Sequence, residues 1–315
     1  MIICPYCQFH NPTEHKFCQS CGSPLQVWRA LLLPGASSVA LIVDPQAAEG
    51  SPSSSDDTDI WQQVAANQAS PIVPAAAFTR AAGDWLGSRE RYRLVEELSL
   101  SEGSQKPVEA QVTDTKPNDM ASSLVEQRQQ FSLVTLGKTD ETQLFPLMAY
   151  PYLALHSRFF PSIPELQQAW IESDYSVLII EDRRALPDLL TVWQEATLDP
   201  LQQVHSFYVM TELWEAMAVF KGQGSLLNIS NLCMDEDQIV CLRCIEMGPY
   251  RNDYRLADMG LLWQSLLQSN DQSLTDLTEL AAKVTEGQFE EIEGLKEALV
   301  AIADLPDTPE PMAQL

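Results

Sequence analysis

The sequence predicts an α+β protein that begins with a small metal-binding module and continues into a larger domain, strand-rich in its first part and helical in its second. Three observations predict this arrangement. Two Cys-x-x-Cys pairs occupy the first 21 residues, apolar and polar residues alternate after Arg91, and apolar residues recur at helical spacing after Asp199. With 315 residues, 45% of them hydrophobic, the chain can form the module and one domain of ordinary size.

The N-terminal module is predicted from four cysteines, Cys4, Cys7, Cys18 and Cys21, whose two pairs are separated by ten residues. Four thiolates at this spacing can surround one Zn²⁺ ion tetrahedrally, with Zn–S distances of roughly 2.3 Å. The first 25 residues resemble the zinc ribbon family, so we expect a zinc ribbon over residues 1–29 with one structural Zn²⁺. Four thiolates leave no coordination position for water, and this metal is therefore not expected to be catalytic.

Disulfide bonds or a redox pair are the alternatives for these cysteines. Disulfides persist in oxidising compartments. A cysteine at position 4 leaves no room before it for the basic and apolar parts of a secretory leader. We therefore expect reduced thiols and a cytoplasmic protein.

The excess of acidic over basic residues limits the kinds of partner that the chain can bind. The chain has 44 acidic and 19 basic residues, a net charge of −25 and an isoelectric point near 4.3. Within residues 1–29 the formal charges are Glu14, Lys16 and Arg29. Such a chain repels phosphate backbones, so nucleic acid is excluded as the partner and a protein or small molecule is favoured.

The most apolar stretch is ALLLPGASSVALIV at 30–43, which is too short to cross a membrane and is interrupted by Pro34 and Gly35. It predicts a hairpin of two short strands over residues 30–44. Residues 45–90 follow as a flexible linker, because PQAAEGSPSSSDDTD lacks aromatic and branched apolar residues. A phosphorylated tail is the alternative for this stretch, and PIVPAAAFTRAAGDWL near its end can form short helices.

A second resemblance begins at Arg91. RYRLVEEL at 91–98 alternates as a strand does. The sequence RYRLVEELSLSEGSQKPVEAQVTDTKPND resembles the first hairpin of bacterial eukaryotic-like Ser/Thr protein kinases. The end of the kinase regulatory helix, the two strands after it and the hinge are resembled by YLALHSRFFPSIPELQQAWIESDYSVLIIEDRR. The strand pair after the kinase catalytic loop is resembled by NLCMDEDQIVCLRCIE.

This resemblance covers about residues 91–305. It implies a truncated two-lobed kinase-like domain, with an N-lobe over 91–181, a helical C-lobe over 182–305 and a disordered tail over 306–315. PELQQAW is helical by its pattern alone, whereas the resemblance implies that it ends as a strand.

Periodicity predicts the C-terminal helices independently of the resemblance. Asp199 suits the N-cap and Pro200 the first turn of a long helix, and Ser273 suits the N-cap of another that Gly287 ends. The apolar positions that predict the three helices are Phe207, Met210, Trp214 and Met217, with Lys221 on the same side; Leu274, Leu277, Leu280 and Val284; and Phe289, Ile292, Leu295, Leu299 and Ile302.

Most residues that a kinase needs are missing from the matching positions. The glycine-rich loop is reduced to Gly103, and Gln111 stands where the family has its phosphate-binding lysine. Aligning Asn231 with the metal-binding asparagine puts Gly224, Ser225 and Leu226 on the His-Arg-Asp triplet, so a leucine replaces the catalytic base.

The metal-binding triplet of the family aligns with Cys244, Ile245 and Glu246. The family's metal-binding aspartate is therefore replaced by Cys244. The stretch YRLADMGLLWQSLL, which resembles the following helix, begins within about ten residues of Cys244, so the activation segment is missing. Arg255 stands where the family has a bracing acidic residue. The resemblance therefore implies a pseudokinase and not an enzyme.

Other chemically suggestive residues are interpreted as core. Cys241 and Cys244 would face opposite sides of a strand, so with Cys233 they are expected to be buried thiols. His156 and His205 are expected to be core histidines. Four tryptophans are expected to anchor the core: Trp170, Trp193, Trp214 and Trp263.

Two classes of function remain. The favoured one is a non-catalytic regulatory or scaffold protein of Ser/Thr phosphorylation signalling, whose partner is a protein such as a Ser/Thr phosphatase or kinase. The arrangement is similar to the N-terminal region of cyanobacterial metal-dependent Ser/Thr phosphatases, although none of the 13 glycines follows an aspartate, as that phosphatase centre requires. The alternative is an atypical kinase or nucleotide-binding enzyme, and a nucleic-acid-binding zinc ribbon fits the charge least.

Overall fold

The structure, a computed structural model, describes residues 2–34, 38–39, 77–116 and 145–304, except positions 5, 13–14, 24, 88–89, 102–106, 173–174, 247–253, 271–273 and 290. The chain divides into two compact units. Unit 1 comprises Met1–Phe160 and Pro164–Arg183, and unit 2 comprises Pro161–Ile163 and Arg184–Leu315. Strands dominate unit 1 and helices dominate unit 2, which agrees with the α+β class.

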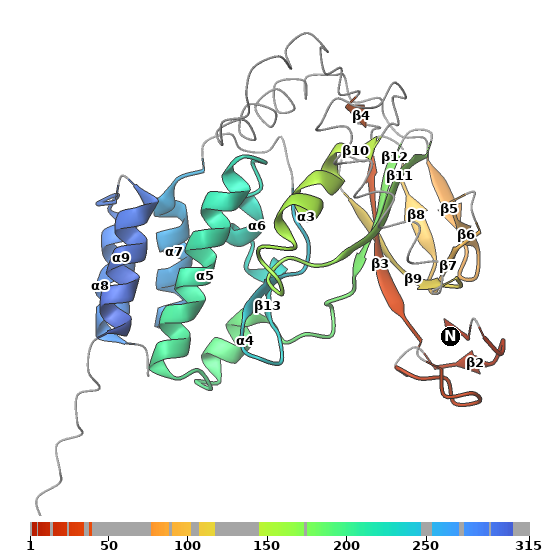
Figure 1. The fold of residues 1–315 in the computed structure, drawn as a ribbon, viewed down its shortest axis with the longest axis horizontal. Helices are drawn as coiled ribbons and strands as arrows, with labels where there is room; N and C mark the ends of the chain where they lie inside the picture. Colours follow the sequence, from red (N-terminus) through yellow and green to blue (C-terminus); the bar gives the residue numbers. More distant parts are fainter. Residues whose placement is uncertain are drawn as a thin grey trace, which may run out of the picture. The chain divides into compact units, whose positions relative to one another are not determined.

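Unit 1 is built on a six-stranded antiparallel sheet with the order β11-β12-β3-β9-β7-β6 (Figure 1). The strands of this sheet are β11 (Leu166–Glu172), β12 (Tyr175–Glu181), β3 (Val27–Pro34), β9 (Val108–Asp114), β7 (Tyr92–Leu94) and β6 (Trp85–Leu86). The other elements of unit 1 are β1 (Ile2–Ile3) paired with β2 (His10–Asn11), β4 (Ser38–Val39) with β10 (Phe145–Pro146), β5 (Phe78–Arg80) with β8 (Leu98–Leu100), the 3-10 turn η4 (Leu147–Ala149) and helix α3 (Tyr150–Leu155). The strand expected from PELQQAW is therefore confirmed as part of β11.

The hairpin expected over residues 30–44 is wrong. Strand β3 pairs with β9 on one side and β12 on the other, while β4 pairs with β10. Ala30, Leu31 and Leu32 are all buried. Successive side chains of a strand point to opposite faces, so these three buried residues show that both faces of β3 are covered. Residues 35–37 and 40–43 lie outside the described part of the chain.

The sheet includes strands that precede Arg91, so the N-lobe expected over 91–181 starts too late. Strand β3 belongs to the middle of the sheet, and β5 and β6 fall within the stretch expected to be a linker at 45–90. PIVPAAAFTRAAGDWL forms strands, not helices, in its described part. The linker residues 45–76 and the tail 306–315 lie outside the described residues.

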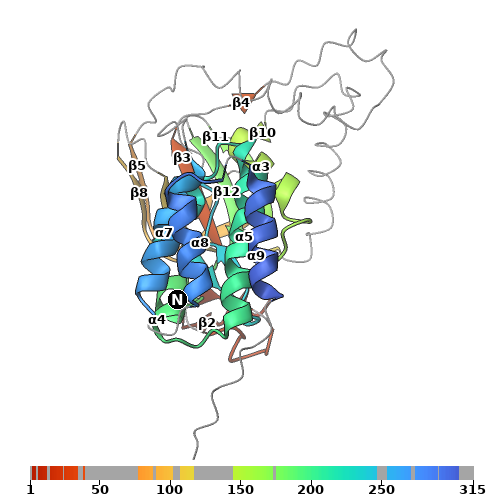
Figure 2. The same cartoon turned by 90° about the vertical axis from the view of Figure 1, so that its left-hand side faces the viewer.

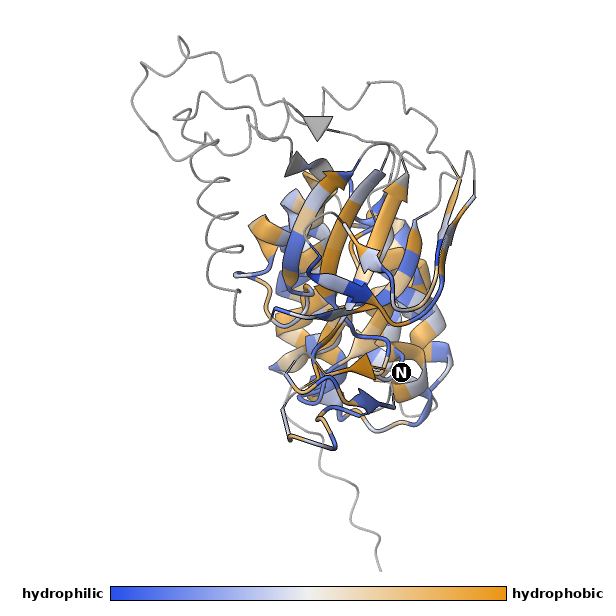
Figure 3. Cartoon of the chain, turned by 90° about the vertical axis from the view of Figure 1, so that its right-hand side faces the viewer, coloured by the Kyte–Doolittle hydropathy of each residue, from blue (hydrophilic) through white to orange (hydrophobic). Residues whose placement is uncertain are grey.

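One face of the sheet carries the main core of unit 1. Hydrophobic residues follow its long strands (Figure 3), and Trp28, Ala30 and Leu32 of β3 pack with Val177 and Ile179 of β12. Trp170 closes this core at the edge strand, where its ring stacks on Tyr92 with centroids 5.9 Å apart. Gly87, at φ 82°, lies so close to Trp170 that a Cβ atom there would be 2.9 Å from the indole ring. A glycine is required at that position.

Unit 2 is mainly helical, and α5, α7, α8 and α9 run side by side (Figure 2). Its elements are α4 (Leu189–Gln194), α5 (Pro200–Ala218), α6 (Gly224–Leu227), η5 (Ile229–Asn231), β13 (Leu232–Met234), β14 (Val240–Leu242), α7 (Leu256–Gln268), α8 (Thr275–Thr285) and α9 (Ile292–Ala303). Strands β13 and β14 pair antiparallel, as expected. Trp193, Phe207 and Trp263 form a buried stack, with centroid distances of 5.3 and 4.4 Å.

The predicted start of α5 is confirmed. The Asp199 side chain accepts a hydrogen bond from the Gln202 amide at 2.8 Å, and the Gln202 side chain accepts one from the Asp199 amide at 2.8 Å. This reciprocal cap satisfies two amides that would otherwise lack partners. Lys221 lies beyond the end of the helix.

The start predicted for α8 needs a correction. Leu274, and not Ser273, is its N-cap, and Ser273 lies outside the described residues. The end is confirmed, because Gly287 has a φ of 74° and its amide donates to the Val284 carbonyl at 3.0 Å. Within the described part of the chain, no helix is long and apolar enough to cross a membrane.

Candidate metal centre

The two Cys-x-x-Cys pairs form two turns with the same backbone geometry, which we call the first and second knuckle (residues 4–9 and 18–23). In the first, the Cys4 amide donates to the Phe9 carbonyl at 2.9 Å and the Gln8 amide to the Cys4 carbonyl at 3.0 Å. In the second, Cys18 donates to Ser23 at 2.8 Å and Gly22 to Cys18 at 2.9 Å.

The left-handed residue of each knuckle explains part of its sequence. Gln8 has a φ of 61° and Gly22 a φ of 71°. Glycine adopts this conformation without cost, whereas glutamine is strained in it. The second knuckle therefore carries the residue that its backbone favours, and the first holds its shape through its hydrogen bonds.

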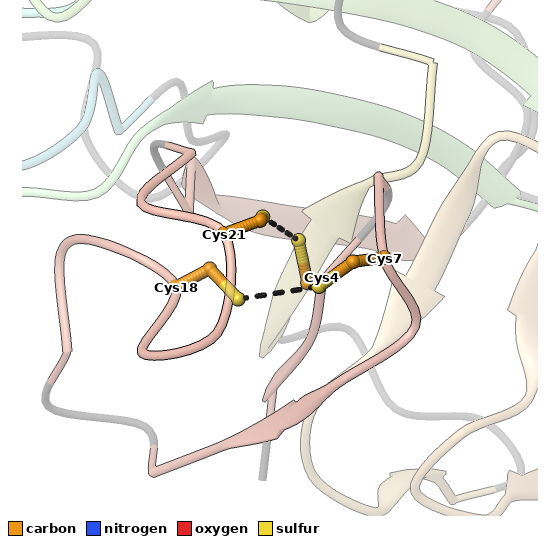
Figure 4. Close-up of side chains that lie close together, drawn as sticks. All are labelled: Cys4, Cys7, Cys18 and Cys21. Atoms are coloured by element: carbon orange, nitrogen blue, oxygen red, sulfur yellow. Dashed lines mark hydrogen bonds between the residues drawn. The ribbon is translucent and has the colours of Figure 1, made fainter.

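The knuckles bring the four sulfur atoms together (Figure 4). The sulfurs of Cys4 and Cys21 are 3.6 Å apart, those of Cys7 and Cys18 are 3.5 Å apart, and all four ligand atoms lie within 4.8 Å of one another. A tetrahedron with Zn–S distances of about 2.3 Å has sulfur–sulfur edges of about 3.8 Å. The four cysteines can therefore hold one metal ion of this size.

The environment of the sulfurs is polar on the side of the second knuckle. The Cys18 sulfur accepts hydrogen bonds from the Ser20 amide at 3.4 Å and the Asn11 side-chain amide at 3.5 Å. Burial alone would raise the pKa of Cys18, but the backbone amides of Cys21 and Ser20, with Asn11, outweigh it and lower this pKa to about 6. Hydrogen bonds between Cys21 and the side chain and backbone of Ser23 lower the pKa of Cys21.

The pKa of Cys7 moves the other way. The Phe9 amide lowers it, but burial and the three neighbouring cysteines together raise it to about 11. A bound cation would favour the thiolate forms of these cysteines instead. Binding of a metal ion is therefore coupled to the loss of protons from these thiols.

A small core fixes the knuckles on unit 1. Ile2, Cys4, Cys18 and Leu25 are buried together with Val95, which lies between β7 and β8. The module is therefore not a separate appendage. It continues directly into β3 and packs on the same body as the sheet.

Asn11 contributes to the centre in a way that the cysteine spacing alone does not predict. It is fully buried at the end of β2. Its side-chain nitrogen donates to the Phe9 carbonyl at 3.0 Å, and its oxygen accepts from the Gln19 amide at 2.8 Å. Asn11 thus ties the first knuckle to the second, and the sequence signal for it was only its position between the cysteine pairs.

The residues aligned with kinase catalytic positions lie in unit 2 in a hydrogen-bonded cluster. Asn231 is buried, and its side-chain nitrogen donates to the carbonyls of Ser225 at 3.0 Å and Cys244 at 2.8 Å. Its oxygen accepts from the Cys244 amide at 3.0 Å. The Ser225 hydroxyl accepts from the Glu246 amide at 2.8 Å. The exposed Glu246 carboxylate accepts from the Asn228 side chain at 2.8 Å.

The remaining aligned residues are placed as follows. Gln111 lies on β9, where its side chain donates to Asp182 at 3.0 Å. Arg255 is the N-cap of α7, and its amide donates to the Asp258 carboxylate at 3.0 Å. Gly103 lies outside the described residues.

The other cysteines are buried, as expected: Cys233, Cys241 and Cys244. Among the residues that the structure describes, the four N-terminal cysteines form the one group of three or more ligand side chains that could hold a metal ion. His205 is exposed on α5, so its assignment to the core is wrong, and His156 is half-buried with its ring edge against Phe160. Trp193, Trp214 and Trp263 are buried, and Trp170 is half-buried.

No protein-family model matches the chain, and no curated protein matches its sequence. The likeness to kinases therefore depends on the residues quoted above, whereas the metal centre is supported by its own geometry.

Proposed function

We propose that this protein is a non-catalytic regulatory or scaffold protein of Ser/Thr phosphorylation signalling. In this proposal its N-terminal module is a zinc ribbon with one structural Zn²⁺, and the rest of the chain is a pseudokinase that binds a protein partner. The partner class is a Ser/Thr phosphatase or kinase, and the compartment is the cytoplasm, where the thiols stay reduced.

The proposal that the protein is not a catalyst is supported by the hydrogen bonds that the side chains of Asn231 and Ser225 make. Both ends of the Asn231 amide are engaged by backbone groups, and the Ser225 hydroxyl is engaged by Glu246. Phosphoryl transfer depends on side chains that are free to position metal and phosphate. Side chains that hold the backbone together in this way cannot do so without breaking these hydrogen bonds.

Nucleotide binding offers a direct test of this part. A ligand at a hundred times its dissociation constant stabilises a fold by about 2.7 kcal/mol, which a thermal-shift assay detects readily. We expect millimolar ATP with Mg²⁺ to leave the melting temperature unchanged. A rise of several degrees that Glu246→Ala abolishes would instead support the enzyme alternative, since Glu246 is the one exposed carboxylate of the cluster.

The charge supports a protein partner. With a net charge of −25, the chain attracts basic surfaces and repels nucleic acid. The test is whether the purified protein changes the rate at which a Ser/Thr phosphatase or kinase from the same cell acts on a peptide substrate. We expect a change in rate that weakens as salt is raised, and no activity from the protein alone.

The metal identity is tested on protein purified without added metal. Mass spectrometry is expected to find one zinc per chain in the native protein and none in the Cys4→Ser, Cys21→Ser double variant. The Cys244→Ala variant, which changes a buried thiol outside the centre, serves as the control and should keep its zinc. Less than one zinc per native chain, or zinc kept by the double variant, would refute the zinc assignment.

A further inference from the structure

Two sulfur–sulfur contacts of the metal centre, of 3.6 and 3.5 Å, join the two knuckles. Cys4 of the first knuckle contacts Cys21 of the second, and Cys7 of the first contacts Cys18 of the second (Figure 4). Each contact joins a buried sulfur to an exposed one, because Cys4 and Cys18 are 0% and 3% exposed while Cys7 and Cys21 lie at the surface. An oxidant can therefore reach one sulfur of each pair.

We propose that this centre is an oxidation site, at which a peroxide converts the pairs Cys4–Cys21 and Cys7–Cys18 into disulfides and displaces the metal. The proposal rests on the metal centre of the proposed function and not on its pseudokinase part. It also makes a specific claim about connectivity. Sequence spacing alone favours local bonds within each Cys-x-x-Cys, whereas the contacts favour bonds between the knuckles.

The chemistry balances with hydrogen peroxide as the oxidant. The thiolate of an exposed cysteine attacks one peroxide oxygen, the O–O bond breaks, and hydroxide leaves while the sulfur becomes a sulfenic acid. The buried partner thiolate then attacks that sulfur, the S–O bond breaks and a second hydroxide leaves. Each disulfide thus uses two thiolates and one peroxide, and four cysteines use two. Once joined in two disulfides, the four cysteines would no longer supply thiolate ligands to a metal ion.

The rest of the module is suited to this product. The hydrogen bonds of each knuckle and the core of Ile2, Leu25 and Val95 involve no sulfur–metal bond. Disulfides between the knuckles hold the same two turns together that the metal held. A thiol reductant should therefore regenerate a centre that binds metal again.

Tryptic mapping of the full-length protein gives a simple readout. Lys16 and Arg29 are the basic residues of the first 29, so trypsin separates the knuckles into peptides 1–16 and 17–29. After treatment with hydrogen peroxide, alkylation of free thiols and digestion without reductant, we expect these two peptides to be linked. The separate, unlinked peptides should be lost, and Cys233, Cys241 and Cys244 should be alkylated only after denaturation. Two separate peptides, each with an internal disulfide, would overturn the proposal.

Paired variants distinguish the two ways of linking the knuckles. In Cys4→Ser, Cys21→Ser the contacting pair Cys7 and Cys18 remains, whereas Cys4→Ser, Cys18→Ser leaves Cys7 with Cys21. Each variant has lost two of the four cysteine ligands, so we expect metal binding to be impaired to the same extent in both. We expect the first to form its disulfide faster, and equal rates or the reverse order would overturn the assigned connectivity.

The metal content before oxidation separates this proposal from the zinc assignment. If the untreated protein contains zinc and peroxide releases it without linking the two peptides, the oxidation site is refuted and the zinc centre stands. If the untreated protein holds no zinc and peroxide still links the peptides, the zinc assignment fails while the oxidation site and its connectivity stand.

Discussion

At the scale of single residues, one buried amide shows how unit 2 is held together. Asn231 joins the carbonyl of Ser225 to both backbone groups of Cys244, which is thirteen positions away in the chain. Backbone groups in such irregular segments lack the partners that a helix or sheet would supply, so a side chain must take that role.

We predict that Asn231→Ala destabilises the protein by about 3 kcal/mol, because it leaves buried backbone groups without partners. Urea unfolding followed by fluorescence or circular dichroism measures this loss. The matched control is Asn228→Ala, which removes an exposed amide with a hydrogen bond to Glu246 and should cost about 1 kcal/mol. Equal losses for the two variants would contradict the role assigned to Asn231.

The sequence could identify the candidate metal ligands but not their supports. Cys4, Cys7, Cys18 and Cys21 carry their chemistry in a fixed spacing, so they could be recognised directly. Asn11 and Asn231 could not be recognised as supports, because an asparagine is equally common in exposed turns. Its role depends on which backbone groups the fold brings to it.

At the scale of elements, β3 shows the limit of local patterns. Its apolar run was compatible with a short hairpin or a buried strand. Its neighbours are β9 and β12, which lie about 80 and 150 residues further along the chain. A short window of sequence carries no information about which strands pair over such distances. Helices such as α5 are held by contacts within one segment, so their periodicity predicted them closely.

The contact between α7 and α8 depends on one glycine. A Cβ atom on Gly260 would lie 2.7 Å from both the backbone nitrogen and the hydroxyl of Thr285 and 3.0 Å from a methyl group of Val284. The helices therefore approach at a point where only a hydrogen atom fits.

We predict that Gly260→Ala destabilises the protein, although alanine favours a helix over glycine by about 1 kcal/mol. The clash involves backbone atoms of α8, which cannot move without shifting that helix. Gly294→Ala on α9 is the matched control, because its Cβ would meet Phe289 at an ordinary 3.7 Å. We expect thermal unfolding to show a lower midpoint for the first variant and an equal or higher midpoint for the second. A stabilising Gly260→Ala would mean that the helices do not touch there.

At the scale of the whole molecule, the metal centre and the sheet belong to one unit. The knuckles pack on Val95 and continue through Leu25 into β3. Loss of the metal should therefore lower the local stability of the strands around it as well as that of the knuckles.

We predict that a chelator increases amide hydrogen exchange in residues 2–25 and in the connection between β7 and β8 that contains Val95. Helix α5 in unit 2, with its own buried stack around Phe207, serves as the internal control and should keep its protection. Exchange confined to residues 2–25 would show that the small core does not couple the centre to the sheet.

The placement of β3 changes what cleavage between the module and the remainder of the chain should do. If the module were a separate domain on a linker, a cut within residues 45–59 would release it. Because β3 precedes that stretch and pairs along its length with β9 and β12, the N-terminal fragment contains a central strand of the sheet.

We therefore predict that the two fragments stay together after such a cut. A protein with a specific protease site inserted between Ser54 and Ser55 should, once cleaved, give two bands on a denaturing gel but a single species in size-exclusion chromatography, with its metal retained. Separating the fragments would remove the buried side chains of β3, including Ala30 and Leu32, from the core of unit 1. Burial of one large aliphatic side chain is worth about 1.5–3 kcal/mol, so several of them, with two ladders of backbone hydrogen bonds, are enough to hold the fragment in place. A metal-containing N-terminal fragment that elutes alone would contradict the central position of β3.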